Sequence, residues 1–157
     1  MSKYKVVKCE NPEIYRTLIE DAYRDSEANC PELFEKYCYK APCSVEDLIE
    51  HTVSTLLEEV NFTLYTIWEN DYLVAYFGRS VLARNVSYLT TFYIFHAYRN
   101  KDFVESFWSI LDSKFAPDLY SCQWQNNIPA IDFLKRNGFK FYSEMRVKDQ
   151  AVVVLKK

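Results

Sequence analysis

Strand-like and helix-like spacings of apolar residues alternate along this chain, and this alternation restricts its fold more than any other feature. Residues 62–68 and 87–95 are rich in β-branched and aromatic side chains, which is typical of strands. Residues 44–59 instead place apolar side chains every three or four positions, as on one face of a helix. Because the two patterns are interleaved, we expect an α/β (α+β) protein in which helices flank a sheet.

Helix-start signals support this interpretation. Ser44 is followed three residues later by Asp47, which is the spacing of a capping box. The segment Asn11-Pro12-Glu13 joins an N-cap residue to a proline and an acid, as at the start of another helix. Asn127 is expected to begin a further helix, which Asn137 and Gly138 end with a left-handed turn.

The whole pattern predicts one domain over residues 1–157. We expect strands at residues 3–8, 62–68, 72–78, 87–95, 119–124, 139–144 and 151–155. We expect helices from residue 11 onward and at residues 44–59, 101–114 and 127–137, with a loop at 26–43 that holds one short helix near 32–39. Because the hairpins are mostly antiparallel, the sheet should be mixed and mostly antiparallel.

Composition excludes several classes of protein. The chain has 157 residues, of which 49% are hydrophobic, and its net charge is −3, so we expect an ordered core and no nucleic-acid partner. No apolar run approaches the roughly 18 residues of a membrane span, and the first residues lack the apolar stretch of a signal peptide. These features favour a cytoplasmic protein without a membrane partner.

Cysteine and histidine spacing gives no sign of a metal site. There are five cysteines and two histidines, and no two cysteines form a CxxC pair. The cysteines are therefore interpreted as small apolar residues in a reducing compartment. The chain also contains only two glycines, so any phosphate site cannot rely on a glycine-rich loop.

Two segments resemble motifs of the GNAT superfamily of acyl-CoA N-acyltransferases. In the first, residues 92–104, Ile94 matches the aliphatic residue that ends a strand and Arg99 matches the Arg or Gln that opens the following loop. The second, residues 127–139, is similar to the family pattern Asn-x-x-Ala-x-x-Phe-Tyr-x-x-x-Gly-Phe. The residues that match it are Asn127, Ala130, Phe133, Gly138 and Phe139.

The resemblance implies an acetyl-CoA-dependent N-acetyltransferase whose acceptor is an amine on a small molecule or a protein. In that family, the pantetheine arm of CoA lies along the strand, and its diphosphate binds backbone amides at the start of the next helix. The positions carried over to CoA contacts are Ile94, Phe95, Arg99, Asn100 and Lys101, with Asn127 near the pantetheine.

The chain departs from the family pattern where the chemistry is expected. Asp102 and Val104 occupy the two small positions of the phosphate loop, and Leu134 occupies the position of the tyrosine that commonly protonates the CoA thiolate. His96 stands at the proline position and is a candidate general base. Tyr142 is a candidate replacement for the missing acid, and so is Tyr93.

Asp102 leaves two hypotheses open. An acid in the first turn of a helix is favourable, so Asp102 could itself occupy the anion position while Asn100 caps the helix. The alternative is a CoA loop that is displaced but still works. The first hypothesis is an active acetyltransferase. The second is a catalytically inactive GNAT-fold protein that acts as a structural module or binds a protein partner. A gap between the strand ending at Phe95 and the strand around Cys122 would favour the enzyme if open, and the module if filled by Phe or Tyr.

Overall fold

The computed structural model describes residues 3–29, 31, 44–59, 61–83, 86–115, 118–147 and 149–157. Its strands are β1 (Lys5–Cys9), β2 (Phe62–Glu69), β3 (Tyr72–Ala83), β4 (Val86–Ile94), β5 (Asp118–Trp124), β6 (Lys140–Val147) and β7 (Gln150–Lys156). Its helices are α1 (Glu13–Asn29), α3 (Val45–Glu58), α4 (Lys101–Lys114), α5 (Ile128–Arg136) and the 3-10 turn η1 (His96–Tyr98). The order of strands and helices agrees with the sequence prediction. The short helix expected at 32–39 lies outside the described residues.

The strands form one mixed sheet in the order β1-β2-β3-β4-β5-β7-β6. Among the strand pairs of the described residues, β4 with β5 is the parallel one and the others are antiparallel. A parallel pair needs a long crossover connection, and α4 lies in the crossover between β4 and β5. The prediction of a mixed, mostly antiparallel sheet flanked by helices is therefore confirmed.

The hairpin predicted from the break at residues 69–71 is present, and β3 is longer than predicted. Asn70 adopts a left-handed backbone angle (φ 54°) in the turn between β2 and β3. We predicted that the second strand would end at Gly78, but β3 continues to Ala83. It continues because β2 and β4 both pair with it beyond Gly78.

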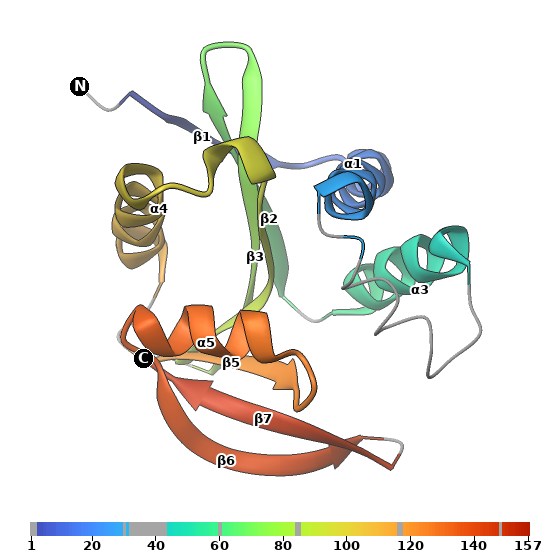
Figure 1. Ribbon diagram of the computed structural model, residues 1–157, viewed down its shortest axis with the longest axis vertical. Helices are drawn as coiled ribbons and strands as arrows, with labels where there is room; N and C mark the ends of the chain where they lie inside the picture. The colour runs from blue at the N-terminus through green and yellow to red at the C-terminus, as the bar shows by residue number, and fades with distance from the viewer. Residues whose placement is uncertain are drawn as a thin grey trace.

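Helices cover both faces of the sheet. On one face, α4 and α5 pack against residues such as Phe77 and Leu89. On the other face, α1 and α3 pack against Leu64 and Tyr76. Figure 1 shows α4 and the α1–α3 pair on opposite sides of β1–β4, while β5, β7 and β6 run in a clearly different direction.

The predicted start of α3 and end of α5 are confirmed, whereas α1 continues to Asn29, past the start at residue 26 of the predicted loop. At α3, the Asp47 N–H donates to Ser44 Oγ (3.1 Å) and the Ser44 N–H donates to Asp47 Oδ2 (3.2 Å), which completes the capping box. At α5, Gly138 follows the helix with φ 97°, which is a conformation that favours glycine. The other glycine, Gly78, is needed for space, because a Cβ there would collide with the Phe62 ring.

The high aromatic content is explained by the core on the α4 and α5 face. Phe77 is fully buried there, 5.0 Å from the Tyr65 ring centroid, 6.2 Å from that of Phe107 and 6.0 Å from that of Phe115. Aromatic pairs at such separations gain energy beyond the burial of their area. The aromatic side chains are therefore mainly structural on this face.

The described part of the chain holds neither a membrane-spanning helix nor a cluster of metal-ligating side chains. No helix in it is both long enough and apolar enough to cross a membrane. No group of three or more His, Cys, Asp or Glu side chains among the same residues is arranged to hold a metal ion.

Candidate functional site

β4 and β5 separate shortly after they begin, and we call the space between them the fork. Their pairing is limited to Val86 with Asp118, Ser87 with Leu119 and Tyr88 with Tyr120. Beyond Tyr88, β4 continues to Ile94 and β5 continues to Trp124, but the two strands no longer pair with each other. The change of strand direction between the two halves of the sheet accompanies this separation (Figure 1). The fork has a closed end at Tyr88 and an open end at Ile94.

Backbone groups of β4 face the fork. The Phe95 N–H donates to the Val74 carbonyl of β3 (3.1 Å). Because successive residues of a strand direct their N–H and C=O groups to opposite edges, those of Ile94 and Phe92 point away from β3, toward the fork. The Ile94 carbonyl accepts a hydrogen bond from Arg99 Nε (2.8 Å). Arg99 therefore already contacts the strand end along which the resemblance places pantetheine.

Helix α4 begins a few residues after the open end of the fork. Asn100 is its N-cap, because Asn100 Oδ1 accepts from the Phe103 N–H (3.0 Å) and the Asn100 carbonyl accepts from the Val104 N–H (3.0 Å). Asp102 is exposed, and among the described residues no hydrogen bond joins its carboxylate to the helix amides. The structure thus gives the capping role to Asn100, as predicted, and does not place Asp102 in the anion position.

Asp25 connects α1 to the open end of the fork. Its Oδ2 accepts hydrogen bonds from the Tyr93 hydroxyl (2.7 Å) and from the His96 backbone N–H (3.0 Å). The Arg99 guanidinium lies 5.1 Å from the Tyr93 ring centroid. Burial and the bond to Asp25 raise the pKa of Tyr93. No sequence pattern pointed to Asp25, which is 71 positions away from His96.

The phenol of Tyr88 lies at the closed end of the fork. The Cys122 thiol of β5 lies beside it. Burial raises the pKa of Tyr88, and the thiol and the nearby Glu59 raise it further. Sequence analysis missed Tyr88, because nothing in a strand pattern indicates where a neighbouring strand diverges.

A row of three oxygen-bearing side chains lies beside Tyr88. Glu59, directly after α3, accepts a hydrogen bond at Oε2 from Ser80 Oγ (3.4 Å). Ser80 Oγ lies 2.7 Å from Thr90 Oγ1 of β4. Ser80 is fully buried, while Glu59 and Thr90 are half-buried. These three residues are distant in sequence, and no motif marked them.

The predicted site residues Phe95 and His96 lie apart from Tyr142. His96 is exposed in η1, at the open end of the fork, and Phe95 immediately precedes it. Tyr142 is exposed on the edge strand β6, where its ring centroid lies 5.3 Å from that of Tyr120. Tyr120 pairs with Tyr88 at the closed end. The structure therefore does not bring His96 and Tyr142 to the same end of the fork.

Asn127 and Leu134 both belong to α5. Asn127 caps this helix, since its Oδ1 accepts from the Ala130 N–H (3.4 Å) and its Nδ2 donates to Gln123 Oε1 (3.2 Å). Leu134 is fully buried in the core against α4. Both residues therefore have structural roles in α5.

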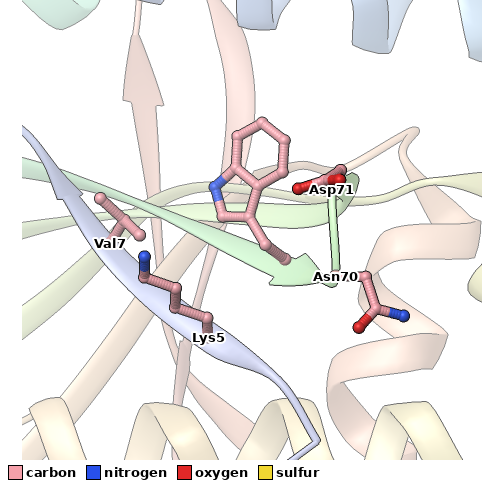
Figure 2. Close-up of a pocket in the computed structure, with 5 residues that line it drawn as sticks. Lys5, Val7, Asn70 and Asp71 are labelled. Carbon is pink, nitrogen blue, oxygen red and sulfur yellow. The ribbon is translucent and has the colours of Figure 1, made fainter.

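A separate hollow of about 330 Å³ lies at the edge of the sheet that β1 forms, away from the fork. Figure 2 shows it between β1, which contributes Lys5 and Val7, and the turn at Asn70 and Asp71. Trp68 forms the rest of the lining. None of the predicted site residues belongs to this hollow.

Comparison with known proteins identifies the fold. No protein-family model matches the chain, and no curated protein is significantly similar to it in sequence. Solved structures do match over nearly the whole chain. An acetyltransferase from Thermus thermophilus has a TM-score of 0.67 at 11% identity, over 98% of this chain and 96% of that one.

Two further structures extend this result. The PaiA N-acetyltransferase from Thermoplasma acidophilum, solved in complex with coenzyme A, has a TM-score of 0.57 at 17% identity, over 98% of both chains. The ribosomal-protein-S18-alanine N-acetyltransferase from Escherichia coli has a TM-score of 0.54 at 13% identity, over 98% of this chain and 92% of that one. The chain therefore has the GNAT-like acetyltransferase fold.

Buried phenols lead to a first prediction, concerning stability at alkaline pH. The pKa values of Tyr76, Tyr88 and Tyr93 are raised above the usual value, mainly by burial. Above about pH 10 the unfolded chain loses these protons while the folded chain keeps them, so stability must fall as pH rises. For Tyr76 alone the slope approaches ~1.4 kcal/mol per pH unit.

Urea unfolding between neutral and alkaline pH measures this effect. The Tyr76→Phe variant should show a shallower alkaline decline than the wild type, whereas Tyr72→Phe, at a side chain that is 69% exposed, should leave the decline unchanged. Equal slopes in the wild type and Tyr76→Phe would contradict the prediction.

Proposed function

We propose that this protein is an N-acetyltransferase that transfers the acetyl group of acetyl-CoA to an amine. The observation that carries the proposal is the fork, in which unpaired backbone groups of β4 lead toward the N-terminus of α4. An extended amide-containing arm can bond to such a strand edge, and a diphosphate can bind at such a helix terminus. Relatives of the same fold supply independent support, since one of them is solved with coenzyme A.

The two ends of CoA would bind at different parts of the fork. The pantetheine amides would bond the fork-facing groups of Phe92 and Ile94, with Phe95 beside them. The diphosphate would lie at the start of α4, where Arg99, Asn100 and Lys101 are exposed and two of the three are cationic. Arg99 would have to release the Ile94 carbonyl in order to reach the phosphates. Asn127, at the start of α5, stays a prediction as a pantetheine contact.

The thioester would lie near the closed end of the fork. Tyr88 is the best-placed acid there, because its phenol lies beside a thiol at the closed end of the fork and a tyrosine is protonated at neutral pH. His96 as base and Tyr142 as acid stay predictions. His96 lies toward the diphosphate end, and Tyr142 lies beside Tyr120.

Asp102 should weaken CoA binding without abolishing it. A carboxylate about 5 Å from a diphosphate costs about 3 kcal/mol per charge pair at an effective dielectric near 20, and solvent screening at an exposed position reduces this. We therefore expect Asp102→Asn to raise CoA affinity about tenfold. Isothermal titration calorimetry measures the affinity, and the gain should shrink at high salt.

Asp132→Asn is the matched control for this prediction, because Asp132 is an exposed carboxylate on α5. It should leave CoA affinity unchanged. Equal affinities in Asp102→Asn and the wild type would show that Asp102 does not oppose CoA binding.

A second candidate function is a catalytically inactive GNAT-fold module that binds a protein partner. A specific contact favours it, because Arg99 Nε occupies the Ile94 carbonyl at the open end of the fork. Phe141, Tyr142 and Met145 of β6 are exposed and would suit a partner.

Calorimetric titration with acetyl-CoA and CoA separates the two candidates. Saturable binding, followed by acetyl transfer to spermidine, lysine or a lysine-containing peptide, is expected of the enzyme. Release of the CoA thiol reports this transfer. Absence of binding at millimolar CoA would refute the enzyme and leave the module.

A further inference from the structure

We infer that Glu59 accepts the proton that the acceptor amine releases, and that Ser80 and Thr90 relay this proton. The inference rests on the proposed function and adds to it a route for the proton. Its basis is the row of hydrogen bonds that joins the end of α3, the middle of β3 and the fork-forming strand β4. The ring of His96, the base expected from the sequence, lies at the other end of the fork.

The direction of the hydrogen bonds in this row is fixed by proton counting. A hydroxyl has one proton to donate and two lone pairs that can accept. Ser80 donates its proton to the Glu59 carboxylate, so Thr90 must be the donor in the 2.7 Å contact with Ser80. The Thr90 oxygen then keeps lone pairs that can accept a proton, and every donor in the row points toward the carboxylate.

Backbone geometry places Thr90 at the fork. Gly78 of β3 pairs with Thr91, and Arg79 pairs with Leu89, so Thr90 is the extra residue of a β-bulge. It lies two positions beyond Tyr88, the last β4 residue that pairs with β5. A bulge redirects a side chain locally, and here it brings the Thr90 hydroxyl to Ser80 on the face that α3 covers.

The reaction balances through this row. The amine nitrogen attacks the acetyl carbonyl carbon and forms the C–N bond, while the C–S bond breaks and its electron pair leaves with sulfur. The amine proton passes to Thr90 as Thr90 gives its proton to Ser80 and Ser80 gives its proton to Glu59. Tyr88 protonates the thiolate, after which Glu59 loses its extra proton to solvent and Tyr88 regains one from solvent. The net transfer is one proton from the amine to CoA.

Few charged groups of the described residues face Glu59. From β4, Tyr88 is close enough for the Glu59 charge to raise its pKa, and Cys122 of β5 lies beyond that phenol. Arg79 of β3 is directed to the other face, where its guanidinium lies 5.8 Å from the Phe115 ring centroid. Glu58, the preceding residue of α3, is exposed.

Acetyl transfer by the full-length protein tests the relay, with thiol release from acetyl-CoA as the signal and spermidine, lysine and a lysine-containing peptide as acceptors. Glu59→Gln should lower kcat about 100-fold, which is the usual contribution of a general base, and it should remove the acidic limb of the pH–rate profile. Ser80→Ala should lower kcat similarly, because it interrupts the row while Glu59 remains. Glu59→Asp should restore the acidic limb in part.

The controls separate this inference from the proposed function. Glu58→Gln should leave kcat and the pH profile unchanged, and calorimetry should show wild-type CoA affinity in Glu59→Gln and Ser80→Ala. If the wild type transfers acetyl groups and Glu59→Gln keeps its rate and its acidic limb, the relay is wrong and the proposed function stands. If the wild type binds no CoA, or binds it and acetylates none of the three acceptors, both are wrong.

Discussion

Phe77→Ala is expected to lower the free energy of unfolding by about 3–5 kcal/mol. Phe77 is fully buried and lies within 6.2 Å, between ring centroids, of Tyr65, Phe107 and Phe115. Truncation removes its buried area and leaves a cavity that the rings of β2 and of α4 with its C-cap residue cannot readily fill. Because small proteins are stabilised by only about 5–15 kcal/mol in total, this one substitution should remove a large share.

Urea denaturation measures this loss as a lower midpoint at an unchanged slope. Phe141→Ala is the matched control, because Phe141 is also a strand phenylalanine but is 60% exposed. It should change stability by less than about 0.5 kcal/mol. Similar losses in the two variants would show that the ring cluster around Phe77 is not the main core.

Tyr88→Phe is expected to lower kcat for acetyl transfer about 100-fold while CoA affinity stays nearly constant. Tyr88 is the phenol at the closed end of the fork, where it lies beside the Cys122 thiol. Phenylalanine keeps the ring and its packing but cannot donate a proton to the leaving thiolate. The loss should therefore appear in kcat, because the proton is needed only as the C–S bond breaks.

Tyr120→Phe is the control, since Tyr120 pairs with Tyr88 across the start of the fork and has its own hydroxyl contact with Lys156. It should keep kcat within a few-fold of the wild type. Thermal melting of both variants separates lost chemistry from lost folding. A Tyr88→Phe protein with wild-type kcat would remove Tyr88 from the mechanism.

The resemblance in the sequence located one part of the candidate site and missed the other. Residues 92–104 indicated the strand end, the loop and the start of α4, because those features are local in sequence. The cap by Asn100 was predicted correctly for the same reason. Asp102 was considered as a built-in occupant of the anion position, but the structure leaves it exposed and the Asn100 side chain accepts from the Phe103 N–H instead.

The closed end of the fork could not be predicted. Tyr88, Cys122, Glu59 and Ser80 come from four elements, and none of them stands out within its own element. Tyr88 resembles the other strand tyrosines until the divergence of β5 gives it a thiol as partner. Asp25, similarly, is an ordinary residue of α1 until the packing of that helix brings it to Tyr93 and His96.

The sequence by itself determined the order of the elements, the caps of α3 and α4, the left-handed turn after α5 and the mixed character of the sheet. These features follow from the spacing of apolar residues and from hydrogen bonds between residues close in sequence. Both signals can be recognised within a short segment of the chain. Only the tertiary structure decided where β4 and β5 part, which phenol lies between them and which carboxylate is joined to the fork by hydroxyls. Those contacts form between residues far apart in the chain, and the packing of the helices on the two faces of the sheet sets them.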